Sequence, residues 1–223
     1  MRKFGIIFGT FVVIAALLIA GGVAWYGHAY PTYTYRFRLA IAVDVGGETK
    51  TASSVIEVKT ITQSSFLPQV PPIRNEVHGD AVFLDLGQGR NVIVTLAWGP
   101  NGSEDRAGFL VPTEYGIGGL ENLPQLQTLR GARDLTGEYL PALITFHDLN
   151  DPTSARVVAP DQFEQVFGPD VHFERVWIEM TSDPLTGEIA QRLPWLPHPG
   201  YLSGRFACAP SEPNCLHGSS FSR

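Results

Sequence analysis

The sequence predicts an α+β protein in which an N-terminal transmembrane helix precedes a β-rich domain of antiparallel hairpins with short helices. Three observations support this fold class. An uncharged apolar run opens the chain, alternating apolar and polar positions separated by glycine turns follow it, and 23 Gly and 17 Pro are spread throughout. Such frequent breaks suit short strands joined by turns better than a helical bundle.

Residues 4–26 form the predicted transmembrane helix. They carry no charged side chain, and a helix of this length spans roughly 34 Å, which is enough to cross a bilayer. Arg2 and Lys3 precede the helix, so the positive-inside rule predicts that residues 1–3 are cytoplasmic and that the body lies outside. Cleavage of a signal peptide near Gly27-His28-Ala29 is the alternative. We favour the uncleaved anchor because the apolar run exceeds the usual length of about 7 to 15 residues in a signal peptide.

Two β-hairpins are predicted next. In the first, apolar and polar residues alternate with the period of a strand that buries one face. Gly46-Gly47 supplies the positive φ angles of a tight turn, and Gly87-Gln88-Gly89 does the same for the second hairpin. The paired segments are residues 33–43 with 49–61, and residues 81–86 with 91–98.

The remaining elements are short. Residues 99–119 read as a long loop, with only Phe109-Leu110-Val111 suggesting a strand, and loops of this length often carry function. Capping residues and apolar spacing predict the rest. The predicted elements are a helix from Asn122 to Gly131, a strand at 142–146, a helix at 160–167, a mid-sheet strand at 171–181 whose centre at 176–178 is buried on both faces, and a helix from Asp183 to Leu193.

The expected domain covers residues 30–200, and residues 201–223 form a Pro-, Gly- and Ser-rich tail. Cys208 and Cys215 are the only cysteines, and the turn-rich hexapeptide between them predicts a disulfide. Such a bond would stabilise the fold by roughly 2.5 kcal/mol in the chain-entropy model. A zinc site is less favoured because His217 is the only further ligand nearby.

The charge of the body excludes several partners. Residues 30–223 carry 14 Lys plus Arg against 22 Asp plus Glu, since Arg2 and Lys3 are the only charged residues before them, and the formal net charge is −8. Nucleic-acid binding needs clustered cations that neutralise phosphates, so no nucleic-acid partner is expected. The same acidity argues against anionic lipid headgroups.

No segment carries a specific catalytic, cofactor-binding or metal-binding motif, so no residue is assigned to such a site. Asp148, Asn150 and Asp151 supply several oxygen atoms, but the spacing of a calcium loop is missing, and a self-bonded turn is predicted instead. Glu174 and Glu179 point to opposite faces of their strand, unlike a glycosidase pair. Three histidines are candidates for a catalytic site formed by residues far apart in the sequence, but each is better explained as an isolated surface or core residue: His78, His147 and His172.

Several segments resemble a group of uncharacterised, membrane-anchored bacterial proteins. The resemblance rests on residues 146–152 (FHDLNDP), 167–169 (FGP) and 192–196 (RLPWL), and on the early strands at 35–38 and 54–58. It implies a bacterial inner-membrane protein with its C-terminal domain in the periplasm, and it implies no reaction.

Two functional hypotheses follow. The first is a non-enzymatic module of the cell envelope that binds another envelope protein or a second copy of itself. The second is a membrane-tethered hydrolase whose residues come from the 99–119 segment and the acidic turn after Phe146.

Overall fold

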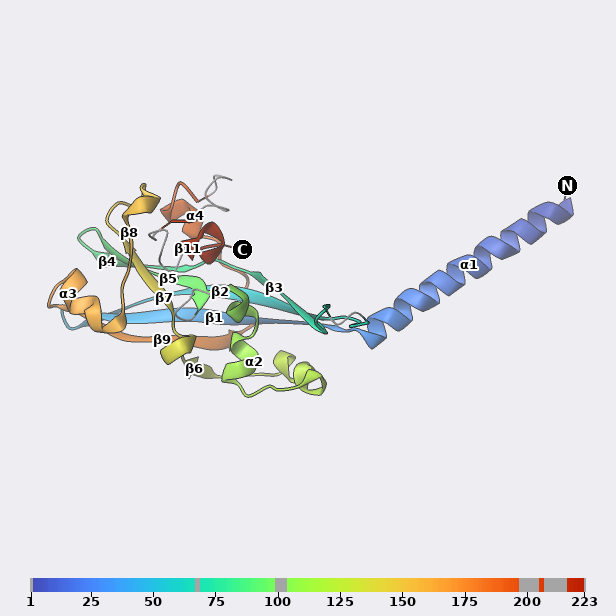
Figure 1. Ribbon diagram of the computed structural model, residues 1–223, viewed down its shortest axis with the longest axis horizontal. Coiled ribbons are helices and arrows are strands. Elements are labelled where there is room, and N and C mark those ends of the chain that lie inside the picture. The colour runs from blue at the N-terminus through green and yellow to red at the C-terminus, as the bar shows by residue number, and fades with distance from the viewer. Residues whose placement is uncertain (1, 67–68, 99–103, 197–204, 207–215, 223) are drawn as a thin grey trace. The chain divides into compact units, whose positions relative to one another are not determined.

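The computed structural model describes residues 2–66, 69–98, 104–196, 205–206 and 216–222 (Figure 1). Side chains of the N-terminal helix are described from Ile14 onward. Cys208 and Cys215, the predicted disulfide pair, lie outside the described residues. The chain divides into two compact units, one formed by residues 1–33 and 60–74 and the other by residues 34–59 and 75–223.

The described chain is α+β, with mostly antiparallel sheets and few short helices, as predicted. The α-helices are α1 (Arg2–Ala29), α2 (Leu110–Glu114), α3 (Phe163–Phe167) and α4 (Ile189–Arg192). The strands are β1 (Thr32–Val45), β2 (Glu48–Thr62), β3 (Ile73–His78), β4 (Val82–Gly87), β5 (Arg90–Trp98), β6 (Ala132–Asp134), β7 (Pro141–Phe146), β8 (Ala155–Val157), β9 (Val171–Thr181), β10 (Arg205–Phe206) and β11 (Leu216–His217). The 3₁₀ helices are η1 (Glu104–Gly108), η2 (Leu120–Gln127), η3 (Gly137–Tyr139), η4 (Pro152–Ser154), η5 (Pro160–Gln162) and η6 (Gly218–Ser220).

The first unit contains α1 and the segments that follow it. The carbonyl of Pro31 accepts two hydrogen bonds from Thr62, one from the backbone N–H at 3.2 Å and one from the hydroxyl at 2.7 Å. The large apolar side chains of α1 are exposed, with Leu18 at 72% and Trp25 at 67%. In the part of the chain that the structure describes, no helix combines the length and the apolarity needed to cross a membrane.

The second unit contains most of a five-stranded sheet with the strand order β3-β2-β1-β9-β6. The predicted first hairpin is confirmed, because β1 and β2 are joined at Gly46 and Gly47, whose φ angles are +65° and +86°. Strand β9 lies between β1 and β6, which confirms its mid-sheet position. At the centre of β9, where burial of both faces was predicted, Val176 and Ile178 are fully buried on one face, while Trp177 on the other face is only partly buried. The flanking charged residues Arg175 and Glu179 are exposed.

The four-stranded sheet has the order β4-β5-β7-β8, and each neighbouring pair of strands is antiparallel (Figure 1). The nearly continuous hydrophobicity of the β4–β5 hairpin predicts that both of its strands are covered on both faces. This is confirmed for β5, where every residue from Asn91 to Trp98 is buried, but not for β4, where Asp85 is exposed. One face packs against α4 and the segments around it. The buried cluster there consists of Ala81, Ile93, Ala97, Ile144, Phe146, Ile189, Leu193, Trp195, Leu196 and Phe221.

Phe221 belongs to this core although the sequence pattern assigned it to a tail. Its side chain is fully buried, and its ring lies 5.7 Å from that of Trp195 and 6.1 Å from that of Phe146, measured between centroids. The backbone N–H of Ala81 also donates to the carbonyl of Phe221 at 2.7 Å. The described residues 216–222 are therefore part of the folded domain.

Two predicted elements take a different form. The helix predicted from Asn122 is the 3₁₀ helix η2, which begins at Leu120 and ends at Gln127. Its ends show hydrogen bonds over three positions, including one from Thr128 to Gln125 at 2.9 Å. The apolar run at 109–111 enters α2 rather than a strand, with Leu110 and Val111 buried.

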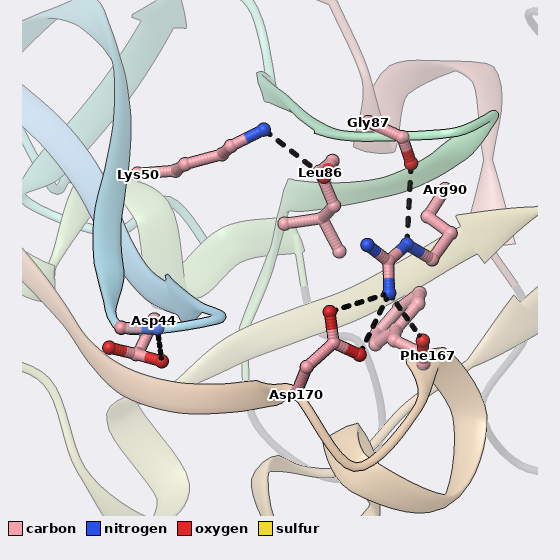
Figure 2. A network of polar contacts seen from close by, with 8 residues as sticks. Asp44, Lys50, Leu86, Gly87, Arg90, Phe167 and Asp170 are labelled. Atoms are coloured by element: carbon pink, nitrogen blue, oxygen red, sulfur yellow. Dashed lines mark hydrogen bonds and ion pairs between the residues drawn. The ribbon is translucent and has the colours of Figure 1, made fainter.

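Arg90 joins the β4–β5 hairpin to the turn between α3 and β9 (Figure 2). Its guanidinium donates to the carbonyl of Phe167 at 2.8 Å and to that of Gly87 at 3.3 Å, and it forms an ion pair with Asp170 at 3.2 Å. On the neighbouring hairpin, Lys50 donates to the carbonyl of Leu86 at 3.1 Å. These bonds connect the two sheets at one end of the second unit.

Candidate functional site

A groove of about 530 Å³ lies in the second unit. This volume falls within the range of about 300 to 1,000 Å³ that is usual for ligand sites. We call it the β1–η2 groove. It is lined by Thr34, Tyr35 and Arg36 of β1, Glu57 of β2, Leu126, Gln127, Leu129 and Arg130 of η2 and the residues after it, Met180 and Thr181 of β9, and Ser182.

One wall of the groove is built around the carboxylate of Glu57. The whole residue is 8% exposed, and Arg36 reaches its Oε2 atom through Nε and Nη2, each at 2.8 Å. Lys59 lies 3.8 Å from the other carboxylate oxygen. A buried carboxylate needs such partners, because an unpaired charge in this position would carry a large desolvation cost.

Arg36 also fixes the chain that leaves β9. Its Nη1 atom donates to the carbonyl of Asp183 at 3.3 Å, and the side chain of Asp183 forms an ion pair with Arg38. In the sheet register, Arg36 lies opposite Thr181. The guanidinium of Arg36 is thus already engaged by protein groups, and it forms a rigid wall of the groove.

The opposite wall is η2 and the short stretch that leads into β6. Leu123 and Leu126 are buried and hold this segment in place. The carbonyl of Gly131 accepts hydrogen bonds from the Met180 backbone N–H at 3.1 Å and from the Tyr115 hydroxyl at 2.6 Å. The backbone that carries Arg130 is therefore fixed on both sides.

Arg130 provides the uncompensated charge of the groove. Its guanidinium donates a hydrogen bond to the carbonyl of its neighbour Leu129 at 2.6 Å, and no described carboxylate pairs with it. The lining has two cations, Arg36 and Arg130, against one anion, Glu57, and so carries one formal positive charge. Apolar surface from Leu126 and Met180 lies in the same groove. An anionic ligand with an apolar part matches this lining.

The acidic turn after Phe146 is self-contained, as predicted. Asp148 Oδ1 accepts hydrogen bonds from the backbone and the side-chain amide of Asn150 at 2.9 and 3.0 Å. Asp151 Oδ1 accepts from the backbone N–H of Thr153 at 2.8 Å and from its hydroxyl at 2.6 Å. The hydroxyl bond is the main reason why the pKa of Asp151 lies below its ordinary value. These carboxylate oxygens therefore accept hydrogen bonds from residues of the same turn.

The other residues weighed from the sequence are dispersed. His172 Nδ1 lies 2.9 Å from Glu164 Oε1 on an exposed surface, and Glu174 accepts a hydrogen bond from Thr49 at 2.8 Å. His78 is on β3, and His147 follows β7. Within the described ranges, no group of three or more His, Cys, Asp or Glu side chains is arranged to hold a metal ion.

The groove residues were missed because they come from four distant segments. The sequence does contain a signal for the Arg36–Glu57 pair. A two-residue turn at Gly46-Gly47 places Arg36 opposite Glu57 when positions are counted outward along both strands, and opposite charges at such positions attract. Nothing in the sequence around Arg130 marks it out from other exposed arginines.

No protein family model, curated protein or solved structure matches this chain.

Proposed function

We propose that this protein is a membrane-anchored, extracytoplasmic binding module of the bacterial envelope, and that it acts without catalysis. We further propose that the β1–η2 groove receives an anionic, partly apolar segment of another envelope protein. The observation that carries this proposal is Arg130, a fixed cation without a carboxylate partner in the described chain, set beside apolar surface in a groove of about 530 Å³. Arginine is well suited to this role because its planar guanidinium binds carboxylates in bidentate geometry.

The membrane anchor is supported by the sequence of residues 4–26, which carries no charge and follows two basic residues. Helix α1 covers this run. Its large apolar side chains between Ile14 and Tyr26 are all at least half exposed, and contiguous apolar surface of this kind favours an apolar environment. The positive-inside rule then gives an inner-membrane protein with its C-terminal domain in the periplasm.

We propose that the protein acts without catalysis because no set of described residues is arranged like the active site of a hydrolase. Such an enzyme needs a nucleophile hydrogen-bonded to a base. Among the described residues, His172 is the histidine whose side chain is hydrogen-bonded, and its partner is a carboxylate rather than a hydroxyl. No observation favours the hydrolase over the binding module.

Site-specific photocrosslinking in native membranes tests the proposal. A photoreactive phenylalanine replaces Gln127, which is exposed and lines the groove. The matched control carries the same group at Gln125, an exposed residue of the same 3₁₀ helix that is not part of the lining. We expect a discrete adduct with another envelope protein from position 127 and none from position 125.

A charge reversal tests the role of the cation. Arg130→Glu should reduce the position-127 adduct by about tenfold or more, which corresponds to ~1.4 kcal/mol of binding free energy. Arg133→Glu is the matched control, because Arg133 is also exposed and also bonds the carbonyl of the residue before it, at 2.9 Å. The proposal is overturned if position 127 gives no adduct, gives only a dimer of this chain, or gives an adduct equally sensitive to both reversals.

A further inference from the structure

A second, smaller pocket lies between β2, the start of β4 and the segment that ends in α4. Its volume is about 110 Å³. A water molecule occupies about 30 Å³ in the liquid, so the pocket has room for roughly four water-sized groups. Its lining combines carboxylates, a guanidinium, hydroxyls and an aromatic ring, including Ser54, Asp80, Phe83, Thr186, Glu188 and Arg192. We call it the Asp80 pocket.

Asp80 is a buried carboxylate with spare acceptor capacity. The residue is 9% exposed. Its Oδ2 atom accepts one hydrogen bond, from the backbone N–H of Ile189 at 3.3 Å. No described residue donates to Oδ1, and no described cation pairs with the carboxylate. Buried carboxylates are usually paired or accept several hydrogen bonds, so this oxygen is suited to a donor from a ligand.

Glu188 adds a second carboxylate at the mouth of the pocket. Its side chain is exposed and forms no ion pair with a described residue. Arg192 follows it by four positions, a spacing at which oppositely charged residues on a helix often pair. The guanidinium carbon of Arg192 instead lies 5.2 Å from the centre of the Phe83 ring. The walls therefore hold two acidic groups and a cation that do not neutralise one another.

The two hydroxyls of the pocket leave one hydrogen to donate. Ser54 Oγ and Thr186 Oγ1 are 2.9 Å apart, and one of them donates to the other. The Val55 backbone N–H donates to Thr186 Oγ1 at 2.8 Å. Because a hydroxyl group donates only one hydrogen, whichever hydroxyl accepts the bond from the other keeps its own hydrogen for a further acceptor. A ligand carboxylate can accept it.

We propose that the Asp80 pocket binds a small zwitterion of the α-amino acid class, with a side chain no larger than that of alanine or serine. The ammonium group is received by Asp80 and Glu188, which together offer only acceptors. The carboxylate is received by Arg192 and by the free hydroxyl hydrogen of the Ser54–Thr186 pair. This site is separate from the β1–η2 groove, with which it shares no lining residue, and it does not depend on the membrane anchor.

Isothermal titration calorimetry on the full-length protein in detergent tests the site with glycine and L-alanine. Acetate and methylammonium, which each keep one of the two charges, are the ligand controls, and L-leucine tests the size limit. We expect saturable binding of glycine and alanine, and at least about tenfold weaker binding of all three controls, because each of them loses one charged contact or the fit.

Substitutions of exposed residues test the pocket without disturbing the buried core. Arg192→Gln and Glu188→Gln change exposed residues and should each weaken glycine binding by about tenfold. Arg175→Gln is the matched control, because Arg175 also lies over an aromatic ring, at 4.3 Å from the centre of Trp177, but outside the pocket. The buried Asp80→Asn variant should bind weakly while keeping its circular dichroism spectrum. The proposal fails if glycine gives no saturable heat, if acetate or methylammonium binds equally well, or if Arg175→Gln weakens binding as much as Arg192→Gln.

Discussion

Replacing Arg90 by methionine removes the charged head of a side chain that links three segments, while leaving a stem of similar length. Arg90 is well suited to such a test because its side chain is only 20% exposed and bonds to Gly87, Phe167 and Asp170 (Figure 2). The short bond to the Phe167 carbonyl, made by a charged donor, is worth about 1.5 to 3 kcal/mol. The longer bond to Gly87 adds about 0.5 to 1 kcal/mol.

The ion pair with Asp170 contributes less. The side chain of Asp170 is 49% exposed, and exposed pairs are worth about 0.2 to 1 kcal/mol. The folded protein also loses hydration of the Arg90 guanidinium, and this cost offsets part of the stabilisation that its bonds provide. We therefore expect Arg90→Met to lower the free energy of unfolding by about 3 kcal/mol, and Asp170→Asn to lower it by less than about 1 kcal/mol.

Urea unfolding of the full-length protein in detergent, followed by tryptophan fluorescence, measures both values. The buried Trp98 and Trp195 report on the loss of the core. In a domain of this size, 3 kcal/mol corresponds to a fall in Tm of about 6 to 12 °C. Arg156→Met is the matched control, since Arg156 is exposed on β8, and its effect should stay within about 0.5 kcal/mol. A loss below about 1 kcal/mol for Arg90→Met, or an equal loss for Asp170→Asn, would refute the reasoning that the carbonyl bonds dominate.

Three further predictions concern the core, a turn and a titrating group. Phe221→Ala should cost about 3 to 5 kcal/mol in urea unfolding, because the side chain is fully buried; a loss below about 1 kcal/mol would contradict its place in the core. Gly79→Ala should destabilise by more than Gly89→Ala, because a Cβ at Gly79, where φ is +150°, would lie 3.1 Å from backbone atoms, whereas at Gly89 it would meet nothing within 4 Å; equal losses would contradict this. Asp151 should titrate below the ordinary aspartate pKa in NMR and return toward it in Thr153→Val. Because the folded pKa is lowered, the stability that Asp151 contributes is present above the unfolded pKa and lost as pH falls through the folded one.

The hairpins were predictable because their signals are local. Alternation over β1 and the positive φ angles at Gly46 and Gly47 depend only on neighbouring residues, and the same holds for the helix that ends at Gly168. The helix predicted from Asp183 shows where local reasoning fails. Only α4 forms, from Ile189 onward, and the segment before it is held by contacts with other elements: the carbonyl of Asp183 accepts from Arg36 of β1, and the hydroxyl of Thr186 accepts from the backbone of Val55 in β2.

The candidate groove was less predictable because its walls are joined by contacts between residues far apart in the sequence. The Arg36–Glu57 pair could be derived by counting along a hairpin, but the approach of η2 to β9 depends on the bond between Met180 and Gly131, which joins distant parts of the chain. Phe221 was missed because a single phenylalanine among glycines and serines has no periodic pattern. Its burial is decided by the cavity that other segments leave.

The burial of Phe221 also bears on how the domain folds. Strand β4 begins at Val82, yet the face of its sheet that holds Phe221 closes only when that residue, far along the chain, is in place. Contacts between positions so far apart close slowly, because the intervening chain must first lose its freedom. An intermediate without this contact leaves the apolar layer of Ala81, Phe146 and Trp195 open to water.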